Sequence, residues 1–178
     1  MTKSKITIYK TVYSAVCLAL AMVLPIITGT VPKIGNMLCP MHIPVLLCGF
    51  LCGWQWGVAV GFIAPLMRSF IFSMPPLYPQ AASMAFELAT YGLISGLLYK
   101  LLPKKFYNVY LTLIISMLSG RIVWGIARTI MAEISAAPFS FNAFISGAVV
   151  TAVPGIAIQI VFIPLIIALL KKAKLVLN

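Results

Sequence analysis

The residues able to do chemistry in this chain are few, and most of them lie inside apolar stretches. The stretch MAFELATYG, residues 84–92, carries Glu87, one of only two acidic residues; the other is Glu133. His42 is the single histidine. General acid–base catalysis uses a histidine or positioned carboxylates, and no HExxH, Walker A or GxSxG pattern occurs here. These residues therefore predict ligand binding rather than an enzyme, with no cofactor and no metal site.

Several polar residues fall within or beside apolar segments, and we expect them to share one site. The predicted substrate-binding residues are Glu87, Arg121, Arg68, Arg128, His42 and Asn142, with Tyr91, Trp124 and Tyr78 as aromatic walls. An ionisable residue in a membrane span is costly and usually faces the protein interior or a wet cavity. A small-molecule site combines apolar walls with a few convergent polar groups. This set therefore favours a shared binding pocket.

Simpler interpretations of the same residues stay open. Glu87 either pairs with Arg121 or Arg128 as an internal staple, holds a ligand, or relays protons. His42 precedes Ile43 and a proline, so it is also consistent with a residue that only begins a helix. Arg128 is also consistent with a place at the membrane interface, with its aliphatic stem along the span.

The elements that must position these residues are membrane helices. Charged residues make up 8% of the 178 residues, against about 25% in a soluble domain. The mean hydropathy is +1.10. A transmembrane helix needs about 20 apolar residues. The apolar segments lie at about 8–28, 42–52, 56–72, 80–99, 107–131 and 141–170. They are continuous rather than alternating, which argues against a β-barrel. We predict an all-α membrane protein, one domain over residues 1–178 with six transmembrane helices.

The lysines predict the orientation of these helices. With six spans, nine of them fall on one side of the membrane: Lys3, Lys5, Lys10, Lys100, Lys104, Lys105, Lys171, Lys172 and Lys174. The positive-inside rule then places both termini in the cytoplasm, with the chain in the plasma membrane. The net charge of +11 is thus explained by the membrane, not by nucleic acid.

The connections on the opposite side are rich in Pro and Gly, and we expect them to be non-helical: 28–40, 73–80 and 134–140. Glu87 would lie about 10 Å inward from the outer end of its span, at 1.5 Å per residue. The other candidate residues also fall in the outer half of the membrane, beneath these loops.

Small residues recur at four-residue spacing in two places. Gly49, Gly53, Gly57 and Gly61 span the junction of the second and third segments, and Ala15 and Ala19 lie in the first. Small residues at this spacing let helices approach closely in lipid. We predict packing within the chain for the glycines. The four cysteines, Cys17, Cys39, Cys48 and Cys52, are predicted to be small packing residues, with Cys48 and Cys52 on one helix face.

Together these features resemble the substrate-binding S components of energy-coupling factor (ECF) vitamin transporters. The resemblance covers the whole chain and includes the Ala15/Ala19 pair, the glycine series and the segment MHIPVLLCGFLCG, residues 41–53. It implies a binding site for a vitamin or precursor near the external face. It also implies that Ala15 and Ala19 dock on a membrane coupling subunit, which carries two ATPases. An alternative is a self-sufficient small-solute or proton-coupled carrier; a membrane enzyme or scaffold is a further one.

The polar residues of the predicted site suit more than one class of vitamin. Glu87 can accept hydrogen bonds from hydroxyl or amine groups or pair with a ring cation. That favours vitamin B6-like pyridoxine or pyridoxal, or a hydroxymethylpyrimidine. The arginines instead suit an acid such as pantothenate, by bidentate pairing with its carboxylate.

Overall fold

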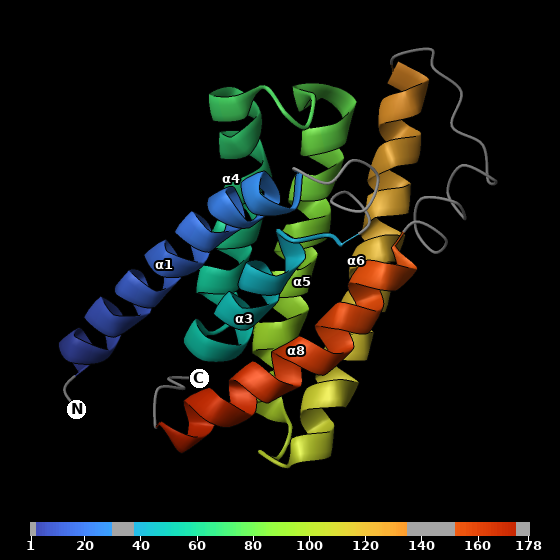
Figure 1. Ribbon diagram of the computed structural model, residues 1–178. Helices are drawn as coiled ribbons and strands as arrows, with labels where there is room; N and C mark the ends of the chain where they lie inside the picture. The colour runs from blue at the N-terminus through green and yellow to red at the C-terminus, as the bar shows by residue number, and fades with distance from the viewer. Residues whose placement is uncertain (1–2, 30–37, 135–151, 174–178) are drawn as a thin grey trace.

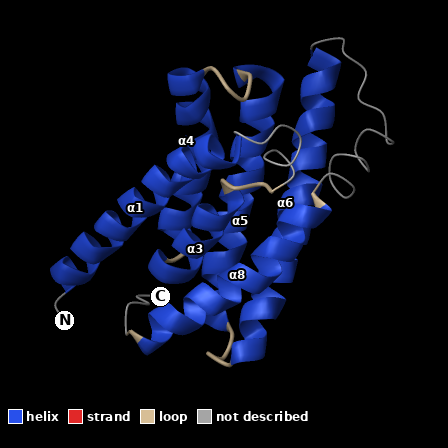
Figure 2. Cartoon of the chain, in the orientation of Figure 1, coloured by secondary structure: helices blue, strands red, loops and turns tan. Residues whose placement is uncertain are grey.

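Every regular element in the part of the chain that the structure describes is helical. The computed structural model describes residues 3–29, 38–134 and 152–173 (Figures 1 and 2). The elements are α1 (Lys3–Gly29), α3 (His42–Cys52), α4 (Trp54–Phe72), the π-helical turn η1 (Leu77–Ala81), α5 (Ala82–Leu101), α6 (Phe106–Ile134) and α8 (Val153–Lys172). Five helices are long and apolar enough to cross a membrane, and α3 is a shorter apolar helix. The predicted all-α membrane fold of six helices is confirmed.

The predicted connections agree with the structure only in part. Residues 77–80 were expected to be non-helical, but η1 continues directly into α5 and only Tyr78 within it has extended backbone angles. The amide of Ala81 donates to the carbonyl of Pro76 at 2.9 Å, which closes this turn despite its prolines. The connections at 30–37 and 135–140 lie outside the described residues, as does the first part of the predicted last span.

Helix α3 is too short to cross a bilayer. Its 11 residues extend about 16 Å at 1.5 Å per residue, roughly half the apolar thickness of a membrane. It begins about halfway along the bundle and runs to one end of it, packed among α1, α4, α5 and α8 (Figure 1). All of its residues except Ile43 are buried. His42, at its start, is therefore an interior residue and does not begin a full span at the membrane surface.

Glycines bring α3, α4 and α5 into backbone contact. A Cβ atom on Gly57 of α4 would lie 2.7 Å from the carbonyl oxygen of Gly92 on α5. A Cβ on Gly49 of α3 would lie 2.8 Å from that same oxygen, and one on Gly61 would meet the backbone of Leu88. The predicted packing of these glycines within the chain is confirmed. Backbones can meet this closely only where side chains are absent.

Gly53 joins α3 to α4 without a loop. It is the single residue between the two helices, and its φ of 96° is a conformation that side chains rarely adopt. The junction between the predicted segments 42–52 and 56–72 is therefore a single glycine, because helix α4 already begins at Trp54.

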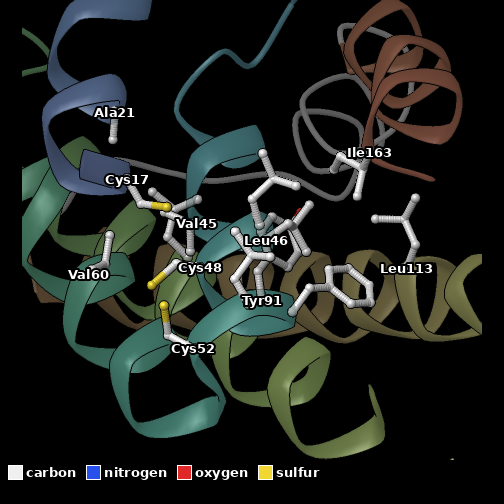
Figure 3. Close-up of a cluster of buried hydrophobic side chains, with 14 of the residues drawn as sticks. Cys17, Ala21, Val45, Leu46, Cys48, Cys52, Val60, Tyr91, Leu113 and Ile163 are labelled. Carbon is white, nitrogen blue, oxygen red and sulfur yellow. The ribbon is translucent and has the colours of Figure 1, made fainter. Parts of the chain in front are cut away.

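The interface of α1 with α3 contains a cluster of thiols. Cys17 from α1 and Cys48 and Cys52 from α3 are buried and point toward one another (Figure 3). The Cys48 thiol also donates to the hydroxyl of Ser14 at 3.5 Å. These cysteines are free thiols that fill the core, as predicted, and Cys48 and Cys52 share one face of α3.

One end of the bundle is basic. It is formed by the start of α1, the α3–α4 joint, the α5–α6 turn and the end of α8 (Figure 1). We call it the basic end. Its described lysines are Lys5, Lys10, Lys100, Lys104, Lys105, Lys171 and Lys172. The Lys171 ammonium donates to the carbonyl of Lys104 at 2.8 Å and so ties α8 to the α5–α6 turn.

The close approach of α4 and α5 can be tested with one methyl group. Gly92→Ala places a Cβ against the Gly57 backbone, so we expect it to lower the free energy of unfolding by about 1–3 kcal/mol. Gly29→Ala is the matched control, because a Cβ there meets nothing within 4 Å. Thermal unfolding in detergent measures both. Equal midpoints for the two variants would contradict the packing argument.

Candidate functional site

The carboxylate of Glu87 is the centre of a buried polar cluster. Glu87 lies in the second turn of α5 and is 1% exposed. Its Oε1 atom lies 2.9 Å from Nη1 of Arg121 and accepts a hydrogen bond from the Tyr91 hydroxyl, also at 2.9 Å. Nε2 of His42 lies 3.4 Å from the same oxygen. Three helices, α3, α5 and α6, therefore meet at one carboxylate oxygen.

The local sequence explains how these groups meet. Glu87 and Tyr91 are four residues apart, so they lie one above the other on the same face of α5. A Cβ on Gly120 of α6 would collide with the Tyr91 ring, so the absence of a side chain lets that ring pack against α6. The next residue, Arg121, then reaches Glu87. The rings of His42 and Tyr91 lie with their centroids 5.2 Å apart.

A loop residue completes the cluster on the side of Arg121. Cys39 precedes α3 and has a left-handed backbone, with φ of 47°. Nη2 of Arg121 donates to its sulfur at 3.7 Å. Burial raises the pKa of the Cys39 thiol, which keeps it uncharged beside the ion pair. Sequence reasoning missed Cys39, because nothing in its spacing distinguishes it from the packing cysteines.

Two buried nitrogens of the cluster have no hydrogen-bond partner among the described residues. Nδ1 of His42 and Nε of Arg121 make no hydrogen bond to any described residue. Burying such groups unmatched costs about 1–3 kcal/mol each. The cluster therefore combines a satisfied ion pair with two polar atoms that a ligand could satisfy.

The other predicted residues lie at differing distances from Glu87. Arg128 is seven residues after Arg121, two turns along the same face of α6, and is partly buried. Trp124 lies between these two arginines in the sequence, and its side chain is buried, with 8% exposed. The Tyr78 hydroxyl donates to the carbonyl of Met131 at 2.6 Å, which ties η1 to the last turns of α6. Asn142 lies outside the described residues.

Arg68 does not contact the Glu87 cluster. Its Nη1 atom donates to the carbonyl of Met22 at 2.9 Å, and its guanidinium lies 5.3 Å from the centre of the Phe72 ring. This hydrogen bond to the backbone of α1 holds α1 against α4.

The described residues contain no group of three or more His, Cys, Asp or Glu side chains placed to hold a metal ion.

A comparison with protein families identifies the chain. The model of the ECF transporter substrate-specific component matches residues 10–170. The chain belongs to this family. No curated protein and no solved structure matches it. It is therefore a multi-pass membrane protein that binds a small-molecule substrate for an ECF importer and works with a coupling subunit and ATPases.

The contribution of the Glu87–Arg121 pair to stability can be measured with a double-mutant cycle. Glu87→Gln or Arg121→Gln alone leaves one buried charge unmatched, so each should lower the free energy of unfolding by about 3–5 kcal/mol. The double variant leaves no unmatched charge and should lose much less than the sum. Unfolding in detergent provides the readout.

Glu133→Gln serves as the control for this cycle. It neutralises the other acid, which is exposed near the end of α6, and should change stability little. Strictly additive losses for Glu87 and Arg121 would mean that the pair is not coupled.

Proposed function

We propose that this subunit binds a water-soluble vitamin or vitamin precursor at the Glu87 cluster and delivers it to an ATP-driven ECF importer. The observation that carries the proposal is a buried carboxylate matched by donors from α3, α5 and α6, beside two polar nitrogens that no described residue satisfies. In the family, the substrate-specific component supplies the binding site.

Charge in the cluster favours a neutral or weakly basic ligand. Arg121 already pairs with Glu87 at 2.9 Å, so the pair carries no net charge. A carboxylate ligand would have to displace Glu87 from Arg121 and would be repelled by it. A heteroaromatic ring with hydroxymethyl groups can instead donate to Glu87 and accept from Nε of Arg121. We therefore propose pyridoxine, pyridoxal or a hydroxymethylpyrimidine ahead of pantothenate.

The remaining predicted residues extend the proposed site. Trp124, Arg128, Tyr78 and Asn142 are proposed to form its wall on the side of the Pro-rich connections. Arg68 would reach this site only by releasing its contacts with the Met22 carbonyl and the Phe72 ring.

The basic end supports a proposed orientation. Lysines from α1, the α5–α6 turn and α8 gather there, and the positive-inside rule assigns such an end to the cytoplasm. We propose that both termini are cytoplasmic in the plasma membrane. Substrate then enters from the opposite end, where the α4–α5 connection lies.

An exposed face of α1 supports the proposed docking of a partner. Ala15 and Ala19 are exposed, whereas Ser14, Cys17 and Ala21 face the core. A face of small residues allows a helix of the coupling subunit to approach closely. We propose Ala15 and Ala19 as the contact with this subunit, which carries the two ATPases.

Ligand choice can be tested with purified protein and a panel of vitamins. Calorimetry should detect saturable binding of pyridoxine, pyridoxal or hydroxymethylpyrimidine. Glu87→Gln should weaken that binding by about 1–3 kcal/mol, because the ligand's donors lose their charged acceptor. Tight binding of pantothenate alone would overturn the ligand class. Unchanged affinity in Glu87→Gln with lowered stability would show that Glu87 is only a staple.

Docking can be tested separately from binding. Ala15→Trp with Ala19→Trp should abolish ATP-dependent uptake in the assembled importer, because bulky side chains keep the partner helix away. Ligand affinity should stay unchanged, since both residues lie on the outer face of α1. Leu20→Trp, also exposed on α1 but turned by about 100–140° around the helix from Ala15 and Ala19, is the comparison for added bulk alone. Full uptake in the alanine variant would contradict the docking assignment.

A further inference from the structure

A cleft lies at the basic end, away from the Glu87 cluster. It has a volume of about 600 Å³ and is lined by Ile6, Thr7, Lys10, Gln55, Trp56 and Ala59. The first three residues belong to the first turns of α1, and the others to the first turns of α4. The cleft is thus a gap between the starts of two membrane helices, at the level of one membrane surface.

Charge at this cleft favours an anion. Lys10 lines it directly, and the other lysines of the basic end surround the same membrane surface. Neither acidic side chain of the sequence lies at the basic end of the bundle, since Glu87 is buried in the cluster and Glu133 lies near the far end of α6. Each lysine near an anionic membrane surface contributes favourably to binding.

The start of α4 adds neutral donors beside Lys10. Gly53 precedes the helix, no side chain caps it, and its first turn has no acidic residue. The first amides of a helix have no partner within it and carry partial positive charge. Gln55 and Trp56, which line the cleft, belong to this turn. A tryptophan at this depth also suits the boundary between lipid headgroups and acyl chains.

Apolar surface continues from the cleft along α4. Phe62 and Ile63 are exposed and lie three and four residues beyond Ala59, so all three share one face of the helix. An occupant that is anionic at one end and apolar along its length matches this surface. A small free anion would leave the apolar part unused.

We propose that the cleft binds an anionic phospholipid of the leaflet at the basic end. Its phosphate lies beside Lys10 and the first turn of α4, and its acyl chains follow the Ala59–Ile63 face. The cleft is distinct from the proposed docking contact, because Ile6 and Lys10 lie on the side of α1 that Cys17 shares, nearly opposite Ala15 and Ala19.

Native mass spectrometry of the full chain tests this proposal. Protein is released from nanodiscs that contain equal amounts of phosphatidylglycerol and phosphatidylcholine. The wild type should retain phosphatidylglycerol in preference, and Lys10→Gln should reduce the retained fraction about fivefold. Lys100→Gln is the matched control: it removes one exposed lysine at the same end, outside the cleft, and should retain the preference.

A second variant tests the cleft by shape. Ala59→Phe fills it without a change in charge and should abolish retention of the lipid. Vitamin affinity and thermal stability should persist in all three variants, so failure here is separable from failure of the proposed function. Equal losses in Lys10→Gln and Lys100→Gln, retention by Ala59→Phe, or displacement of phosphatidylglycerol by millimolar inorganic phosphate would each overturn the proposal.

Discussion

A carboxylate inside a membrane protein must be matched by donors, and the cluster around Glu87 meets this requirement with residues from three helices. Arg121 supplies the opposite charge from α6, Tyr91 supplies a hydroxyl from one turn further along α5, and His42 approaches from α3. Because Arg121 carries the opposite charge, a slip of α6 against α5 by one residue would leave a buried charge unmatched, and a slip of α3 would remove the contact of His42. The cluster therefore fixes the register of α3, α5 and α6 relative to one another.

The glycines make this register geometrically possible. Gly57 and Gly92 let the backbones of α4 and α5 meet, and Gly120 leaves space for the Tyr91 ring against α6. The resulting bundle combines close backbone contact between α4 and α5 with a core of large buried side chains such as Phe50 and Tyr91. Close packing is important in lipid, because an apolar side chain gains little free energy when it moves from apolar lipid into an apolar protein interior. Polar matching at Glu87 and close packing at the glycines thus depend on each other.

The apolar runs were enough to predict the helical fold. The lysine positions were enough to predict that the lysine-bearing segments group at one end of the bundle. Both predictions follow from the cost of placing charge in lipid. The pairing of Glu87 with Arg121 was one of two options from sequence; only the register of α6 against α5 decides against Arg128. Arg68 could not be placed, because its contact with Met22 depends on where α1 crosses α4. The place of Cys39 in the cluster was missed, because it depends on the left-handed backbone of Cys39 itself, in the loop before α3. Hydropathy and charge patterns along the sequence predict which segments are buried. Contacts between helices depend on how the helices cross, and these patterns do not encode the crossing geometry.

The shortness of α3 has a consequence for how the protein is made. A helix of 11 residues is too short to enter a bilayer as an independent span, and only Gly53 separates it from α4. The two must therefore insert together during synthesis, as a helical hairpin with one long and one short arm. Since α3 is buried on nearly all sides, it reaches its final surroundings only after α5 and α8 have been synthesised and have closed around it. The residue at its tip, His42, is thereby carried into the middle of the bundle by a segment that lipid alone would not retain.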